Sequence, residues 1–217
     1  MKKIVLNNLI MQFGEKTVFN GFNLEILENE FVCIMGESGS GKSTLLNIMG
    51  LLENPTSGNV EICGYNNPKL NSKIGVKLLR NEISYLFQNF GLIENETVIY
   101  NIKIATRFLK TEKRKQNEII QKALDKMGLK GLENEKIYCL SGGEQQRVAL
   151  AKIMIKPSSI ILADEPTGSL DNVNRDKVMD ILKQIHLSGK TIVLATHDYE
   201  ITKYATRIIN ISEKHER

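Results

Sequence analysis

Short apolar runs separated by polar turns occupy the first part of the chain. Residues 4–10 and 22–26 are rich in apolar side chains and lie on either side of the turn-like residues 13–16, while residues 58–64 alternate between apolar and polar. Alternation with a period of two is typical of strands with one buried face. These segments predict a small antiparallel sheet.

Continuous apolar runs alternate with helical patterns through the remainder. Buried strands are predicted at residues 31–35, 83–87, 160–163 and 191–195. Helices are predicted at residues 44–49, 75–80 and 175–186 and from residue 141 onward. Residues 97–127 also have a helical pattern, in which two separate apolar faces follow one another. Strands that alternate with helices indicate an α/β fold with a mostly parallel sheet. We expect one domain, residues 1–217, with residues 1–90 and 156–217 as its core lobe, residues 91–155 as a helical insert, and a frayed tail at residues 212–217.

Composition adds few constraints. The 217 residues are 41% hydrophobic and 25% charged, and the net charge of +4 is small, so nothing requires a nucleic-acid partner. Cys33, Cys63 and Cys139 are widely spaced, which predicts reduced, mostly buried thiols and no metal cluster. No apolar run approaches the roughly 18 residues of a membrane span, so any membrane would have to be reached through another chain.

A glycine-rich loop follows the first predicted buried strand. Residues 36–43 read GESGSGKS and fit the pattern G-x-x-x-x-G-K-[ST], with a strand before the loop and a helix after it. Glycines allow successive backbone N–H groups to point inward at anionic oxygens, and the helix start adds its dipole. Lys42 would neutralise the outer phosphates and Ser43 would place its hydroxyl on Mg²⁺. The loop predicts a site for a nucleoside triphosphate.

Polar side chains follow the other predicted parallel strands. Residues 164 and 165 are Asp-Glu, Gln88 follows residues 83–87, and His197 follows the strand at 191–195. The carboxyl ends of parallel strands meet at one edge of a sheet, so these side chains are expected beside the glycine loop. Asp164 would hold Mg²⁺, and Glu165 would orient or deprotonate water. His197 would hold the γ-phosphate and Gln88 would complete the shell of Mg²⁺ and water.

A second glycine motif opens the helix near residue 141. Residues 140–147 read LSGGEQQR, and Ser141 with Glu144 fits the S-x-x-E capping box. Gly142 and Gly143 would expose backbone N–H groups at a positive helix end, which makes a second anion site. Spacing leaves open whether this site serves the same nucleotide or that of a neighbouring molecule.

Taken in order, these motifs resemble those of the ATP-binding-cassette (ABC) ATPases over essentially the whole chain. Residues 36–43 are similar to the family's phosphate loop, Gln88 to its Q-loop, residues 140–144 to its LSGGQ signature, Asp164 and Glu165 to its Walker B pair, residues 169–171 to its D-loop, and His197 to its switch histidine. Glu144 replaces the signature glutamine, and activity is expected to survive this peripheral change.

The resemblance implies a P-loop NTPase fold and a site shared between two subunits. Members pair head to tail, so Ser141, Gly142 and Gly143 would seal the ATP on the other subunit, with Asp171 of the D-loop nearby. Phe13, where the family often has tyrosine, would stack on adenine beside Val18. The implied ATP contacts are Phe13, Val18, Gly36, Glu37, Ser38, Gly39, Ser40, Gly41, Lys42, Ser43, Thr44, Ser141, Gly142, Gly143 and Asp171. Catalytic roles fall to Glu165, His197, Gln88 and Lys42, and metal binding to Ser43, Gln88 and Asp164.

The sequences of residues 163–171 and 87–93 resemble those of the subclass that serves macrolide and peptide (bacteriocin) export and lipoprotein release. This resemblance implies an ATPase subunit that works as a homodimer with a transmembrane permease at the cytoplasmic face of the membrane. An importer subunit and a soluble ABC-type ATPase acting on DNA or ribosomes remain as alternatives. A GTP switch is disfavoured because N-K-x-D is absent, and an inactive regulatory module because Glu165 and His197 are present.

Overall fold

The computed structural model describes residues 1–107, 109–168 and 170–211. Its first layer is a four-stranded antiparallel sheet in the order β2-β1-β4-β5. The strands are β1 (Lys2–Phe13), β2 (Lys16–Leu27), β4 (Ser57–Ile62) and β5 (Tyr65–Asn66). The hairpin turns at Gly14, whose φ of 57° suits glycine. The predicted antiparallel sheet is confirmed. Its strands extend beyond the apolar runs because the exposed strand ends need no apolar side chains.

The second sheet has five strands, all parallel, in the order β6-β7-β8-β3-β9. They are β3 (Phe31–Met35), β6 (Ile83–Leu86), β7 (Ile160–Asp164), β8 (Thr191–Thr196) and β9 (Arg207–Asn210). Every residue of β3 and β8 is buried, as their unbroken apolar patterns predict. The edge strand β9 was not predicted. The α/β fold with a mostly parallel sheet is confirmed.

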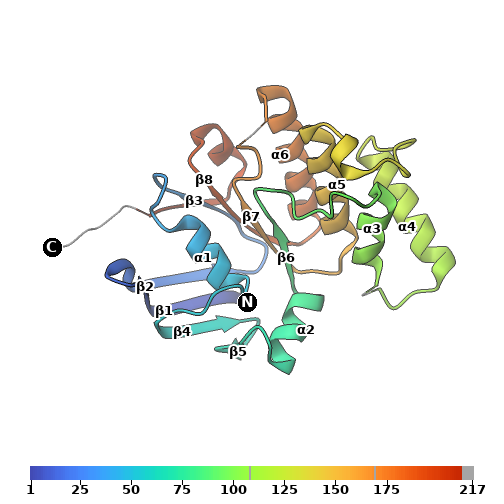
Figure 1. The fold of residues 1–217 in the computed structure, drawn as a ribbon. Helices are drawn as coiled ribbons and strands as arrows, with labels where there is room; N and C mark the ends of the chain where they lie inside the picture. Colours follow the sequence, from blue (N-terminus) through green and yellow to red (C-terminus); the bar gives the residue numbers. More distant parts are fainter. Residues whose placement is uncertain (108, 169, 212–217) are drawn as a thin grey trace.

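Helices pack on both faces of the parallel sheet. They are α1 (Lys42–Met49), α2 (Lys73–Asn81), α3 (Val98–Thr106), α4 (Lys113–Lys126), α5 (Gly142–Ile155) and α6 (Asn172–Leu187), with short 3₁₀ turns at Ile137–Cys139 and Tyr199–Tyr204. Figure 1 shows α3, α4 and α5 gathered on the side away from the antiparallel sheet. Within the described residues, no helix has the length and apolarity needed to cross a membrane.

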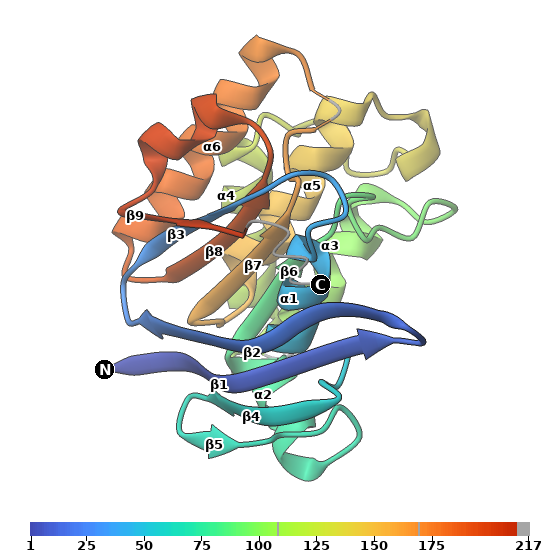
Figure 2. The same cartoon turned by 90° about the vertical axis from the view of Figure 1, so that its left-hand side faces the viewer.

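Alternate residues of the parallel strands point into two different cores. In β7, Ile161 and Ala163 join a cluster formed with α3, α4, α5 and α6, whereas Ile160 and Leu162 join a cluster formed with α1 and the antiparallel sheet. Figure 2 shows the antiparallel sheet as a separate layer below the parallel strands. Burial on both faces fixes the register of the strands, because a one-residue slip would exchange the two cores. The strand ends are therefore held in place.

The cysteines depart from the prediction that they are mostly buried. Cys33 on β3 is buried, but Cys63 is half-buried and Cys139 is exposed, and all three are free thiols. Burial, with Glu165 as a lesser cause, raises the pKa of Cys33 to about 12. Cys139 ends a 3₁₀ turn next to the surface, which an apolar local sequence does not reveal.

These environments predict graded alkylation by iodoacetamide near neutral pH. Cys139 should be modified first, Cys63 more slowly because burial and Glu82 raise its pKa, and Cys33 only after unfolding. Peptide mass spectrometry of native and urea-unfolded protein measures all three. Labelling of Cys33 in native protein as fast as Cys139 would contradict this packing.

Candidate functional site

The glycine loop between β3 and α1 is closed by its own lysine. Lys42 Nζ donates to the carbonyl oxygens of Gly36 and Glu37, each at 2.8 Å. Gly41 has φ 95°, and a Cβ there would lie 2.5 Å from Val18 Cγ1, so only glycine fits. Among the described residues, the Ser40 hydroxyl is buried without a hydrogen-bond partner. A loop that gathers the Lys42 ammonium, an unpaired hydroxyl and the backbone N–H groups of a helix start suits an anionic ligand.

Asp164 at the end of β7 meets Ser43 at the start of α1. Ser43 Oγ donates to Asp164 Oδ1 at 3.1 Å. Burial is the largest influence on Asp164 and raises the pKa of its carboxyl, against the opposing hydrogen bond from Ser43. A partly desolvated carboxylate beside a hydroxyl is a pair of hard oxygen donors, which is the chemistry that Mg²⁺ prefers. The residues present therefore fit Mg²⁺.

Glu165 is held by the end of β8. His197 Nδ1 lies 2.8 Å from Glu165 Oε1, and Thr196 Oγ1 donates to Oε2 at 3.1 Å. The Glu165 backbone adopts φ 43°, an unfavourable value for a residue with a side chain, and its N–H donates to Ala195 O at 2.9 Å. The Glu165 side chain is only 14% exposed whereas that of His197 is 68% exposed. The strained turn aims the carboxylate into the site.

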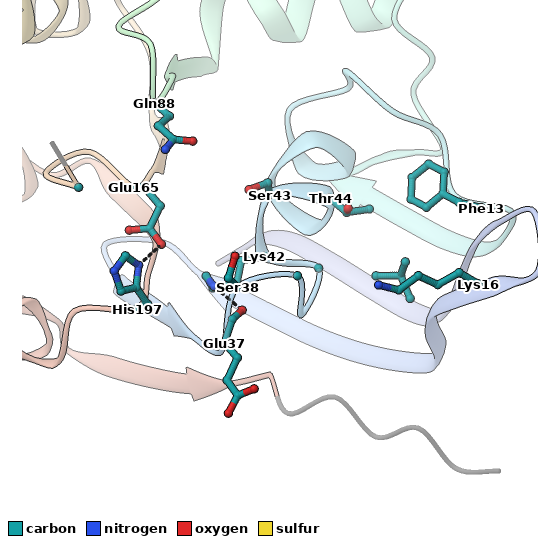
Figure 3. A pocket seen from close by; sticks show the side chains of 14 residues that line it. Phe13, Lys16, Glu37, Ser38, Lys42, Ser43, Thr44, Gln88, Glu165 and His197 are labelled. Carbon is teal, nitrogen blue, oxygen red and sulfur yellow. Dashed lines mark hydrogen bonds and ion pairs between the residues drawn. The ribbon is translucent and has the colours of Figure 1, made fainter.

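Lys42, Ser43, Glu165 and His197 line one cavity of about 650 Å³. Figure 3 shows Phe13 and Lys16 at one end, Glu165 and His197 at the other, and Lys42 with Ser43 between them. The predicted residues that line it are Phe13, Val18, Glu37, Ser38, Gly39, Gly41, Lys42, Ser43, Thr44, Gln88, Glu165 and His197. Gly36, Ser40 and Asp164 belong to the same loop and strand end but do not line it. A cavity of this volume is large enough to hold a nucleotide.

Two lining residues, Lys16 and Gly168, were not predicted. Lys16 pairs with Phe13 across the hairpin, so its place depends on the register of β1 and β2. Phe13 is 46% exposed, which leaves its side chain open to a stacking partner. A lysine directly after a turn gives no sign in the sequence that it faces a ligand.

The second glycine motif does not reach this cavity. Ser141, Gly142 and Gly143 begin α5, and none of them lines the cavity. Ser141 and Glu144 form the predicted capping box, in which the side chain of each residue accepts from the backbone N–H of the other. Gln146 is fully buried and donates to Pro166 O at 2.7 Å, which ties α5 to the segment after Glu165.

Asp171 also lies outside the cavity lining. Its side chain caps α6, accepting from Asn174 N at 2.9 Å and from Asn174 Nδ2 at 2.7 Å. These hydrogen bonds lower the pKa of the Asp171 carboxyl. Ser169, the first residue of the predicted D-loop, lies outside the described residues. A site that used Asp171 and the α5 glycines would have to form against another molecule.

Gln88 follows β6 in a segment with unusual backbone geometry. Phe90 and Gly91 both have positive φ, 64° and 59°. The Phe87 ring stacks on Tyr85 at 4.2 Å, and Lys152 Nζ on α5 donates to Gly91 O at 2.8 Å. Gln88 thus lines the cavity from a segment that is tethered to α5.

A phosphate loop, a buried strand that ends in Asp-Glu, and a parallel sheet that brings both to one edge define a P-loop nucleoside triphosphatase. Within that class, the chain belongs to the ABC transporter family, which matches residues 19–168.

Proteins named macrolide export ATP-binding/permease protein MacB are similar to this chain over most of its length. A macrolide export ATP-binding/permease protein MacB from Vibrio parahaemolyticus is 40% identical over 197 residues, covering 91% of this chain and 30% of that protein. The corresponding MacB from Chlorobium luteolum is 42% identical over 203 residues, covering 92% of this chain and 30% of that protein. The chain thus spans about a third of the length of these relatives.

Two solved structures of MJ0796 match nearly the whole chain. One, titled as the dimeric structure of a bacterial ABC transporter cassette, has a TM-score of 0.87 at 38% identity over 96% of this chain and 94% of that chain. The other, titled as a dimeric post-hydrolysis state bound to ADP and Pi, has a TM-score of 0.86 at 36% identity over the same shares. The chain is an ATPase domain of the ABC class.

The desolvated carboxylate of Asp164 predicts an effect of Asp164→Asn on stability. A raised pKa means that the folded state disfavours the charged form, so stability at neutral pH is reduced and returns as pH falls toward the folded pKa. Without Mg²⁺, Asp164→Asn should therefore melt higher than wild type at pH 7, and this gain should shrink in acid.

Differential scanning fluorimetry with and without MgCl₂ and ATP measures this effect. Wild type should gain more from Mg²⁺ with ATP than from ATP alone, and Asp164→Asn should lose that difference. Asp180→Asn, on the exposed part of α6, is the matched control and should behave like wild type. An Asp164→Asn protein that keeps the full gain from Mg²⁺ would remove Asp164 from the metal site.

Proposed function

We propose that this chain binds MgATP in the cavity at the ends of the parallel strands and hydrolyses it as half of a head-to-tail homodimer. The observation that carries the proposal is the division of the predicted site. Lys42, Glu165 and His197 line one cavity, while Ser141 and the two glycines after it lie on α5 outside that cavity. A second copy, placed head to tail, would supply the missing wall.

Binding would use groups that already face the cavity. The triphosphate would take the inward N–H groups of residues 36–44, and the Lys42 ammonium would exchange its carbonyl partners for phosphate oxygens. Phe13 would stack on adenine, with Val18 against the nucleoside. Ser43, Asp164 and Gln88 would hold Mg²⁺, which neutralises phosphate charge when bound.

Hydrolysis would rest on Glu165. Its carboxylate would accept a proton from a water molecule positioned in line with the γ-phosphate, as general base. His197 at 2.8 Å and Thr196 at 3.1 Å fix the orientation of this carboxylate. His197 is exposed enough to turn toward a γ-phosphate and hold it. Most of the rate gain would come from positioning and neutralised charge.

The membrane partner would contact the helical insert. We assign residues 1–90 and 156–217 to a core lobe and residues 91–155 to this insert, which carries the exposed apolar side chains Ile93, Tyr100 and Tyr138. The matched MacB relatives are named ATP-binding/permease proteins, which supports a permease partner and an export role. The chain would then work at the cytoplasmic face of the membrane, moving a peptide or another amphipathic substrate.

The tether between the insert and the nucleotide site supports this coupling. Gln146 on α5 donates to Pro166 O in the core lobe, beside Glu165. On the same helix, Lys152 donates to Gly91 O at the start of the insert, three residues after Gln88. A change at either strand end would thus reach α5 and the surface offered to the permease.

The proposal predicts the behaviour of Glu165→Gln. The amide keeps the size of the side chain but cannot accept the proton, so turnover should fall about 10²–10⁴-fold while ATP binding persists. The variant should accumulate as an ATP-bound dimer, measured by size-exclusion chromatography with light scattering alongside phosphate release.

Glu118→Gln is the control, since it makes the same carboxylate-to-amide change on the exposed face of α4, outside the cavity. It should retain most of the wild-type turnover. Normal hydrolysis by Glu165→Gln would overturn the assignment of the base.

A further inference from the structure

The serine of the second glycine motif is engaged by a carboxylate of its own helix. Glu144 Oε2 accepts the Ser141 backbone N–H at 2.8 Å and the Ser141 hydroxyl at 2.6 Å. In return, the Ser141 hydroxyl oxygen accepts the Glu144 N–H at 3.4 Å. The hydrogen bond from the Ser141 hydroxyl to Glu144 Oε2 is not part of an ordinary capping box, and it uses the only proton of that hydroxyl.

This engagement limits what Ser141 can offer to another molecule. A serine hydroxyl has one proton, so a hydroxyl that donates to Glu144 cannot donate to a phosphate oxygen. A hydrogen bond from a hydroxyl to a carboxylate is also among the stronger ones in proteins. The serine would have to leave Glu144 before it could bind a phosphate.

The carboxylate also brings charge to this surface. Hydrogen bonds from Ser141, with Arg147 as a lesser cause, lower the pKa of Glu144, so the carboxylate is ionised at neutral pH. Ser141 and Gly142 are exposed and Glu144 is half-buried next to them. An anion that approached the start of α5 would meet this negative charge together with the backbone N–H groups.

We propose that Glu144 is a positioning residue that opposes closure of the ATP-bound dimer, by holding the Ser141 hydroxyl and by repelling the partner's triphosphate. This role rests on the proposed head-to-tail dimer. Closure then requires the hydroxyl to turn from Glu144 to the phosphate. The dimer would open more readily after hydrolysis, since its open form keeps a charge-assisted hydrogen bond.

Glu144→Gln separates this role from helix capping. The amide has the same size and can still accept from the Ser141 N–H, but it is neutral and holds the hydroxyl less tightly. In a Glu165→Gln background, the dissociation constant of the ATP-bound dimer should fall about tenfold, as expected from relief of two like-charge contacts, one at each shared site of the dimer. Sedimentation velocity over a range of protein concentrations measures it.

Two comparisons make the result specific. Glu118→Gln removes an equal charge from the exposed face of α4 and should leave the dissociation constant unchanged. Raising the salt concentration should shrink the difference between the Glu165→Gln protein and its Glu144→Gln derivative, because screening weakens the repulsion. Loss of a structural cap would act in the opposite direction and weaken the dimer.

The outcomes distinguish this role from the proposed function. An ATP-bound dimer of equal or lower affinity after Glu144→Gln overturns the role of Glu144 and leaves the dimer intact. If neither the Glu165→Gln protein nor its Glu144→Gln derivative dimerises with ATP, the proposed function fails, and this role fails with it.

Discussion

Parallel pairing between four strands is the constraint on which the site depends. Met35 pairs with Thr196, Asp164 with Ala195 and Leu86 with Ala163, so β3, β6, β7 and β8 end at one level. Two cores, one on each face, prevent these strands from slipping. The phosphate loop, Glu165 and His197 each follow directly from one of these ends, and Gln88 follows two residues after β6, so the sheet sets the spacing of these groups.

Several groups at this edge are held in states that folding alone would not favour. Glu165 has positive φ, the Asp164 carboxyl is partly desolvated, and Ser40 keeps a buried hydroxyl without a partner in the described chain. Such features are tolerated where surrounding structure is rigid, and they concentrate at functional sites. In this protein they surround the place proposed for phosphate and Mg²⁺, and the Mg²⁺ ion would offset the charge of the partly desolvated Asp164 carboxylate.

Local motifs and apolar patterns were enough to predict most of this arrangement. The phosphate loop and the buried strands have strong local signals, and parallel strand ends meet by necessity. Three features depended on long-range packing and were missed: β9, a short edge strand with alternate residues exposed; Lys16, placed by hairpin register; and the exposure of Cys139. The capping box at Ser141 was predicted, but the hydroxyl bond to Glu144 depends on rotamers that a sequence pattern does not specify.

Complementation between two inactive variants tests the shared site most directly. Lys42→Ala removes the side chain that would bind phosphate. Gly142→Asp places a charge at the α5 start, where, apart from its chain neighbours and the backbone of α5, an added Cβ meets no atom of the described residues within 4 Å. Each variant alone should be nearly inactive. A head-to-tail dimer formed from an equal mixture restores one whole site per heterodimer, so ATPase activity should recover to about a quarter of the wild-type rate. A mixture no more active than the sum of its parts would contradict a site built from two chains.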